Sequence, residues 1–229
     1  MNEKLKQEII TLAKSLGVAD VGFCKDNEAH EMLTNLISIV VPLSKAVTQE
    51  IDKAPTHSYF HHYRTVNAFI DSTLFRIGRL LEENGYLYIP IPASQSVNIN
   101  GCQYNGRYSH KKAARLSGMG TIGKNSLFIH KTLGPAVRLG TLLTDCDFGE
   151  NPPLEENSCL NCNECVKACP AMAIKGGEYK EGVLREEIFD PKACSDYMKS
   201  AFSHIGRGAV CGICMKACIN SHKKGKIDK

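Results

Sequence analysis

Apolar residues recur every three or four positions in two stretches of the chain, as they do on one face of an α-helix. The first stretch covers residues 5–16 and is followed by Gly17. The second covers residues 66–81 and runs up to Asn84 and Gly85. A glycine after the last apolar position is a common helix stop, so both stretches predict helices.

Shorter apolar runs between polar residues indicate buried strands. Five such runs are Asp20–Cys24, Leu36–Val41, Tyr86–Ile91, Ser126–Ile129 and Val137–Thr144, the third being stopped by Pro90 and Pro92. Because these strand signals alternate with helix signals, we expect an α+β domain.

The eleven cysteines are distributed unevenly and indicate a second domain. Only Cys24, Cys102 and Cys146 lie in the first 158 residues, whereas eight lie within 159–218. The polar segment Gly149–Asn157, with two prolines, reads as a connector. We therefore predict an α+β domain in residues 1–150 and a cysteine-rich domain in residues 151–229.

Charge and hydropathy point to a cytoplasmic protein. The formal net charge is only +4, which favours neither a nucleic acid nor a membrane surface as a partner. Residues 1–14 lack the apolar core of a secretory signal, and the longest apolar run, Leu36–Leu43, is too short to span a bilayer. In a reducing compartment, clustered cysteines indicate metal or redox chemistry rather than disulfides.

The cysteine spacing is typical of two-cluster ferredoxins. In the run Cys159-x-x-Cys162-x-x-Cys165-x-x-x-Cys169-Pro170, the first three thiolates of such a motif hold one 4Fe-4S cluster and the fourth reaches the other. A second set follows, although Ile219 replaces the proline usual after the last ligand. We predict cluster one on Cys159, Cys162, Cys165 and Cys218, and cluster two on Cys194, Cys211, Cys214 and Cys169.

Zinc is the alternative, because paired C-x-x-C motifs also build Cys₄ zinc sites. Zinc would account for the two-residue gaps. It would not account for the three-residue steps to Cys169 and Cys218, or for Pro170.

Part of the chain resembles a known family. The segments Ala114–Leu127, Leu139–Asp145, Cys194–Tyr197 and Cys211–Cys214 are similar to the core of epoxyqueuosine reductases and, more distantly, of corrinoid-dependent reductive dehalogenases. The resemblance covers most of the chain and is specific from about Lys111 onward.

The resemblance implies a nitroreductase-like α+β domain that holds a cobalamin, followed by a bacterial-ferredoxin-like module that feeds it electrons. Glycines let backbone approach a large flat cofactor closely. The cofactor-binding candidates are therefore Gly118, Gly120, Gly123, Lys124 and Asn125. Without the resemblance, these glycines would indicate only a turn.

The chain also departs from the family. Epoxyqueuosine reductases carry an acidic proton donor in an Asp-Ser-Ala-Pro-like segment, but the corresponding residues Ile91–Ser96 include no carboxylate, and an apparent insertion, Asn98–Tyr108, follows. Those enzymes also continue into a helical tRNA-gripping extension, whereas this sequence ends at Lys229. We therefore expect a small-molecule substrate rather than tRNA.

Two further groups are candidates for chemistry. His61, His62 and Tyr63 precede the second predicted helix and are the best candidates for acid–base catalysis, or else an aromatic-rich helix entry. Cys102 lies on a glycine-flanked loop in the insertion. It is either a reactive thiol or a small packing residue.

These observations predict an iron–sulfur oxidoreductase. A low-potential donor such as ferredoxin or flavodoxin would charge two 4Fe-4S clusters, which would reduce a cobalamin for reductive chemistry on a small molecule. Two alternatives remain: a flavin in place of the cobalamin, or an electron carrier without catalysis that serves a corrinoid protein.

Overall fold

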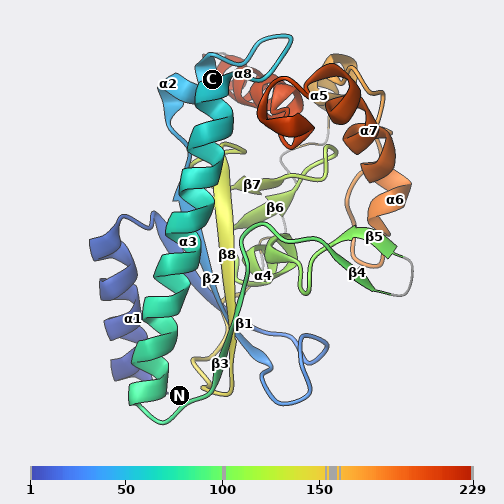
Figure 1. The fold of residues 1–229 in the computed structure, drawn as a ribbon. Coiled ribbons are helices and arrows are strands. Elements are labelled where there is room, and N and C mark those ends of the chain that lie inside the picture. Colours follow the sequence, from blue (N-terminus) through green and yellow to red (C-terminus); the bar gives the residue numbers. More distant parts are fainter. Residues whose placement is uncertain (1, 100–101, 153, 155–158, 160, 228–229) are drawn as a thin grey trace. The chain divides into compact units, whose positions relative to one another are not determined.

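The computed structural model describes residues 2–99, 102–152, 154, 159 and 161–227 (Figure 1). Its helices are α1 Glu3–Leu16, α2 Lys45–Gln49, α3 His57–Glu83, α4 His110–Leu116, α5 Glu164–Ala168, α6 Arg185–Ile188, α7 Pro191–Ala201, η1 Gly206–Gly208 and α8 Ile213–Ile227. Its strands are β1 Asp20–Lys25, β2 Asn35–Pro42, β3 Tyr88–Ile91, β4 Val97–Ile99, β5 Cys102–Asn105, β6 Gly120–Ile122, β7 Phe128–His130 and β8 Val137–Thr144. No described helix has both the length and the apolar character needed to cross a lipid bilayer.

The chain forms two compact units, each built from several segments. Unit 1 comprises Met1–Pro42, Thr65–Gly120 and Arg138–Glu155. Unit 2 comprises Leu43–Arg64, Thr121–Val137 and Glu156–Lys229.

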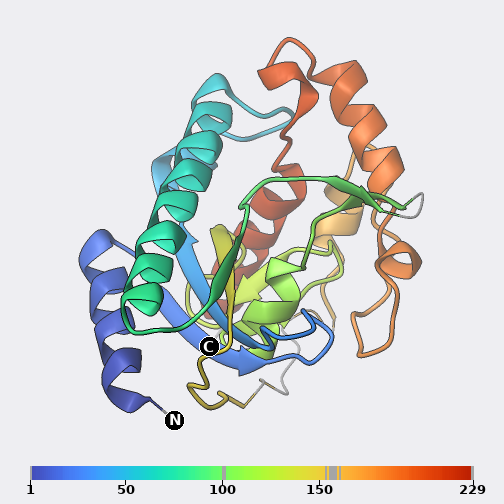
Figure 2. The same ribbon diagram turned by 60° about the horizontal axis from the view of Figure 1, so that its bottom comes forward.

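Unit 1 contains a sheet of four strands in the order β1-β2-β8-β3, with β1 antiparallel to β2 and β3 antiparallel to β8. Helices α1 and α3 cover one face of it (Figure 2). Gly140 of β8 allows α3 to come close, because a Cβ there would lie 2.6 Å from Ile70 Cγ2 and 2.9 Å from Ile39 Cγ1.

Helix α4 covers the other face of the sheet. Its Ala113 packs with Cys24, Leu36, Ile91 and Leu143 in one buried cluster. These four residues alternate with those facing α3, as the two-residue period of a strand requires. The approach is tight at Gly22, where a Cβ would lie 2.5 Å from Ser117 Cβ.

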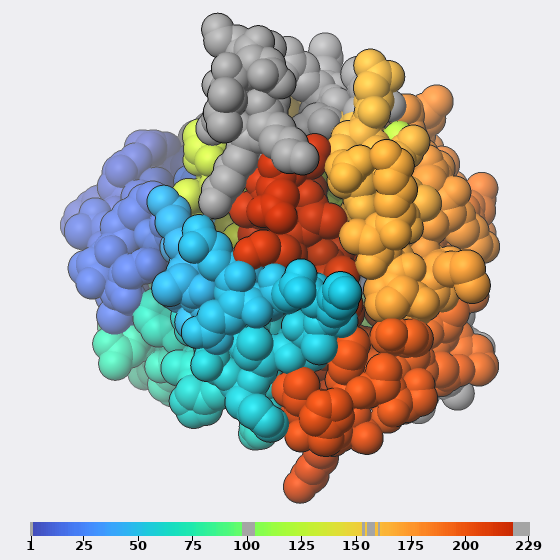
Figure 3. Space-filling model, turned by 90° about the horizontal axis from the view of Figure 1, so that it is seen from above, coloured from blue at the N-terminus to red at the C-terminus, as the bar shows by residue number. Residues whose placement is uncertain are grey.

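Unit 2 brings an N-terminal segment against the cysteine-rich part of the chain. Lys216 of α8 donates a hydrogen bond to the Gln49 carbonyl at 2.8 Å. A Cβ at Gly212 would lie 2.8 Å from Ile51 Cδ1. Figure 3 shows the blue and cyan atoms of this segment beside the red atoms of α8. Residues 43–64 are therefore part of the framework around the cysteines.

Both long helices and the strand Val137–Thr144 are confirmed. The first helix ends as expected, with Gly17 at φ 106°. The strand predicted over Ser126–Ile129 begins later, at Phe128, because Ser126 has a φ of 57° and lies in a turn closed by the Gly123 N–H and the Leu127 carbonyl. Pro90 does not stop β3 but lies within it, at the edge of the sheet, where a missing N–H is tolerated.

The two units differ from the predicted division into residues 1–150 and 151–229. A boundary near the predicted connector exists, at Glu155/Glu156, but residues 43–64 and 121–137 belong to the unit that carries the cysteine pattern. Buried side chains of these segments explain the difference: Ile51, Tyr59 and Ile129 are each no more than 5% exposed.

Candidate functional site

Eight cysteines sort into two groups of four by which thiolates oppose one another's ionisation, and Cys165 also acts on Cys214 across the two groups. We name them thiol group one (Cys159, Cys162, Cys165, Cys218) and thiol group two (Cys169, Cys194, Cys211, Cys214). Burial, and then the charges of its fellow members, raise the pKa of Cys165 to about 11 and that of Cys218 to about 12. Burial and the charges of Cys211 and Cys169 raise the pKa of Cys194 to about 11.

The helices explain how each group draws on distant parts of the sequence. Cys165 lies in α5 and Cys169 caps its C-terminus, yet they belong to different groups. Cys214 and Cys218 are likewise one helical turn apart on α8 and belong to different groups. Because each helix supplies a ligand candidate to both groups, the two groups are interlocked.

The donor set fits iron–sulfur clusters. Buried thiolates that raise one another's pKa need a cationic centre to stay ionised, which bound iron supplies. Hydrogen-bond donors are also present: the Lys124 N–H points to Cys159, the Ile213 N–H to Cys211, and Ser221 Oγ lies 3.1 Å from Cys162 Sγ. Such bonds are known to tune cluster potentials.

No three His, Cys, Asp or Glu side chains of the described residues are arranged to hold a single metal ion. The ten cysteines whose side chains are described form no disulfides. The groups are thus sets of neighbouring thiols rather than closed single-ion shells. The assignment of these eight cysteines to two clusters, made from the spacing, stays a prediction.

Part of the predicted glycine-rich cofactor loop adjoins thiol group one. A Cβ at Gly123 would lie 3.1 Å from Cys159 Sγ. Lys124 is only 6% exposed, and its Nζ donates to Asn163 Oδ1 at 3.0 Å. In unit 1, a Cβ at Gly118 would lie 2.2 Å from the Pro152 carbonyl oxygen. Gly120 begins β6, and Asn125 is buried. Contact of this loop with a corrinoid stays a prediction.

The proposed acid–base residues lie in the first turns of α3. His62 Nε2 accepts a hydrogen bond from the Ser44 N–H at 2.9 Å, just before α2. The Tyr63 ring meets that of Tyr59 edge-on at 6.3 Å. His61 is exposed. His62 and Tyr63 thus have structural contacts, and a catalytic role for the three residues stays a prediction. The side chain of Cys102 lies outside the described part of the structure.

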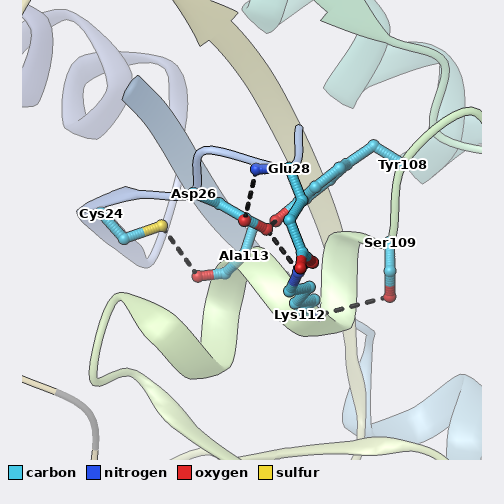
Figure 4. A network of polar contacts seen from close by, with 7 residues as sticks. All are labelled: Cys24, Asp26, Glu28, Tyr108, Ser109, Lys112 and Ala113. Carbon is cyan, nitrogen blue, oxygen red and sulfur yellow. Dashed lines mark hydrogen bonds and ion pairs between the residues drawn. The ribbon is translucent and has the colours of Figure 1, made fainter. Parts of the chain in front are cut away.

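Unit 1 contains a polar network that the sequence did not reveal (Figure 4). Asp26 Oδ2 accepts a hydrogen bond from the Tyr108 hydroxyl at 2.6 Å and pairs with Lys112 Nζ at 2.6 Å. Lys112 also pairs with Glu28 at 2.9 Å. Tyr108 is the last residue of the predicted insertion, so the network ties the end of that segment to the loop after β1.

Electrostatics keep this network charged. Burial opposes ionisation of Asp26, but the bonds from Lys112 and Tyr108 outweigh it and hold the pKa of this carboxyl below its usual range. Burial and the Asp26 carboxylate raise the pKa of the Tyr108 phenol, which therefore stays protonated. No sequence signal marked the pairing, because Asp26 and Tyr108 are 82 positions apart.

Comparison with known proteins identifies the cysteine-rich region. The model of the 4Fe-4S double cluster binding domain matches residues 158–220. The epoxyqueuosine reductase of Bacillus anthracis is 22% identical, with 77% of this chain and 54% of that protein covered. That of Listeria monocytogenes is 36% identical, with 41% and 22% covered. The chain thus spans about half the length, or less, of these relatives.

Solved structures share the fold. An epoxyqueuosine reductase from Streptococcus thermophilus superposes with a TM-score of 0.58 at 20% identity, over 95% of this chain and 66% of that one. The catabolic reductive dehalogenase NpRdhA gives a TM-score of 0.73 at 17% identity, over 92% and 31%. The chain is therefore similar in sequence to epoxyqueuosine reductases, shares its fold with solved structures of these enzymes and of reductive dehalogenases, and matches the 4Fe-4S double cluster binding domain in residues 158–220.

Proposed function

We propose that the protein is an iron–sulfur oxidoreductase that passes single electrons through two 4Fe-4S clusters. One observation carries the proposal: two interlocked groups of four thiols lie inside the region matched by the double cluster domain. Thiol group one would hold one cluster and thiol group two the other. When bound, the clusters would supply one-electron chemistry at low potential.

The acceptor that we propose is a cobalamin, held by a nitroreductase-like domain. The similarity to a reductive dehalogenase whose structure suggested a mechanism for B12-dependent dehalogenation supports this choice. Gly118 and Gly123 do not add to the support, because Pro152 and Cys159 occupy the space that their missing side chains leave. Two alternatives are a flavin in this role and an electron carrier that serves a separate corrinoid protein.

The substrate that we propose is a small molecule rather than tRNA, because Ile91–Ser96 carries no carboxylate in the place of the family's proton donor. A low-potential ferredoxin or flavodoxin would deliver the electrons. Reductive removal of oxygen or another leaving group is the reaction class that fits such electrons.

The test is anaerobic reconstitution of the full chain with iron and sulfide, followed by cobalamin and desalting. We expect about eight irons per chain, as two four-iron clusters require, and about one bound corrinoid. Cys146→Ala is the matched control, since Cys146 is buried but belongs to neither thiol group. About eight irons with no retained corrinoid would reject the cobalamin and leave the flavin enzyme or the carrier. Zinc in place of iron would reject the whole proposal.

A further inference from the structure

Thiol group one has a buried lysine beside it. Lys124 is 6% exposed, and its ammonium group donates to the side chain of Asn163, the residue directly after Cys162. The backbone N–H of Lys124 hydrogen-bonds Cys159. One residue therefore brings both a full positive charge and an N–H donor to this group.

The next residue adds an unsatisfied donor. Asn125 Oδ1 accepts the Leu127 N–H at 3.1 Å, which fixes the orientation of the carboxamide. Its Nδ2 is buried and has no hydrogen-bond partner among the described residues. A Cβ at Gly123 would lie 3.0 Å from Asn125 Oδ1 and 3.1 Å from Cys159 Sγ, so the carboxamide and the thiol line the same small space. A buried N–H without a partner is costly, and a bound acceptor there would satisfy it.

The charged side chains that the fold holds in place beside the two thiol groups differ in sign. Beside thiol group one, the buried Lys124 ammonium group is held at the side chain of Asn163, the residue after Cys162. Beside thiol group two, Asp190 caps the helix that carries Cys194, and its carbonyl accepts the Cys194 N–H at 3.2 Å. Asp190 is fixed in place, because its Oδ1 accepts the Ala193 N–H at 2.9 Å as the cap of α7. Reduction adds one negative charge to a cluster, which a nearby cation and N–H donors stabilise and a carboxylate destabilises.

We propose that Lys124 and Asn125 raise the reduction potential of the cluster on thiol group one above that of the cluster on thiol group two. The inference rests on the proposed cluster-binding function. An electron delivered by the low-potential donor to the second cluster then passes to the first. That transfer oxidises one cluster and reduces the other, with no bond made and no proton moved. Lys124 and Asn125 are positioning residues that give the transfer its direction.

The experiment is an anaerobic redox titration of the reconstituted full chain, followed by electron paramagnetic resonance. Cys162→Ser and Cys194→Ser, which each alter one ligand, assign the two transitions to their clusters. In Lys124→Met we expect the ratio of reduced to oxidised first cluster to fall about tenfold at fixed potential, equal to a shift of about 59 mV for one electron. Asn125→Leu should shift the same transition in the same direction. Lys124→Arg keeps the positive charge, so its first transition should stay near the wild-type potential.

The matched control is Lys167→Met. Lys167 lies on α5, near Cys162, but its side chain is 72% exposed and paired with Glu164, so solvent screens its charge. An unchanged first transition in variants that keep about eight irons would overturn the inference. So would an equal shift of both clusters, or an equal shift in Lys167→Met. If Lys124→Met loses the first cluster, the test rests on Asn125→Leu and on whether its first transition shifts. If both variants lose the first cluster, Lys124 and Asn125 are needed to assemble it, and their proposed effect on its reduction potential is refuted. If the wild-type chain takes up no iron on reconstitution, the proposed cluster-binding function itself is refuted.

Discussion

Gly206 lies directly against the ring of Phe60, so close that a Cβ at position 206 would stand 2.2 Å from Phe60 Cδ2. The two residues are far apart in the sequence. Phe60 belongs to the first turns of α3, and Gly206 begins the short helix η1 between Cys194 and Cys211. This contact fixes residues 43–64 onto the loop that leads into thiol group two.

Gly206→Ala should therefore destabilise the protein. The φ of 63° disfavours a side chain, and the added methyl group would overlap the Phe60 ring. Together these effects should cost about 2–4 kcal/mol. Gly182→Ala is the control, because Gly182 has a φ of 82° but no atom within 4 Å of a Cβ. Anaerobic thermal unfolding of the holoprotein measures the difference. Equal losses in the two variants would mean that the Phe60 contact contributes nothing.

Cys162→Ala should lose the cluster of thiol group one. We expect the iron content to fall from about eight to about four per chain, or lower, because Cys169 and Cys218 each depend on a helix that serves both groups. Iron and sulfide analysis after anaerobic desalting measures this. Cys146→Ala, at a buried cysteine outside both groups, should retain all the iron. Full iron content in Cys162→Ala would refute the ligand assignment.

His62→Ala should weaken the start of α2. The substitution leaves the Ser44 N–H without its acceptor, at a cost of about 1 kcal/mol. For a chain of this length, that corresponds to a fall in apparent Tm of about 2–4 °C. The control is His57→Ala. His57 is exposed and begins α3, the helix that carries His62, so this substitution should change Tm little. An unchanged Tm in His62→Ala, together with lost turnover, would instead favour the acid–base role.

The stability that Asp26→Asn loses relative to the wild type should depend on pH, because the carboxylate of Asp26 is charged in the Tyr108–Asp26–Lys112 network. The pKa of Asp26 is lowered in the folded state. Its contribution is therefore complete above the unfolded pKa of about 3.9 and is lost as the pH falls through the lower folded value. At pH 7 the variant should be about 1.5–3 kcal/mol less stable, since the lost bonds involve charged groups.

That difference in stability should narrow below about pH 4, as the pH falls from the unfolded pKa of Asp26 toward its lower folded value. The control is Asp196→Asn, because Asp196 pairs with Lys192 at 2.6 Å on an exposed helix face, where such pairs contribute little. Anaerobic thermal unfolding at a series of pH values measures both variants. A stability difference that stays constant well below about pH 4, through the range in which Asp26 protonates, would show that Asp26 acts by packing rather than by charge.

The sequence predicted the elements whose signals are local. Residues 5–16 and 66–81 formed helices because their apolar faces are periodic, and Val137–Thr144 formed a strand because both of its faces are buried. The double cluster binding domain could be predicted because cluster geometry fixes the spacing of ligands along the chain, whereas the assignment of each cysteine to a cluster stays a prediction.

Contacts between distant residues could not be predicted in this way. Nothing near Asp26 indicates that Tyr108, or the side chain of Lys112, will meet it, because tertiary packing alone decides that pairing. The glycine pattern was also ambiguous. Gly123 leaves room for Cys159 and Gly118 for Pro152, although a missing side chain next to a cofactor would give the same sequence.

The interleaving of the two compact units limits how this gene can be cut and recombined. A fragment expressed from residues 151–229 would contain all eight cysteines of the motif but neither residues 43–64 nor residues 121–137, which belong to the same unit. Exchanging the C-terminal part with that of a relative would likewise replace only one of three segments. Chimaeras should therefore be designed with all three segments taken from the same parent.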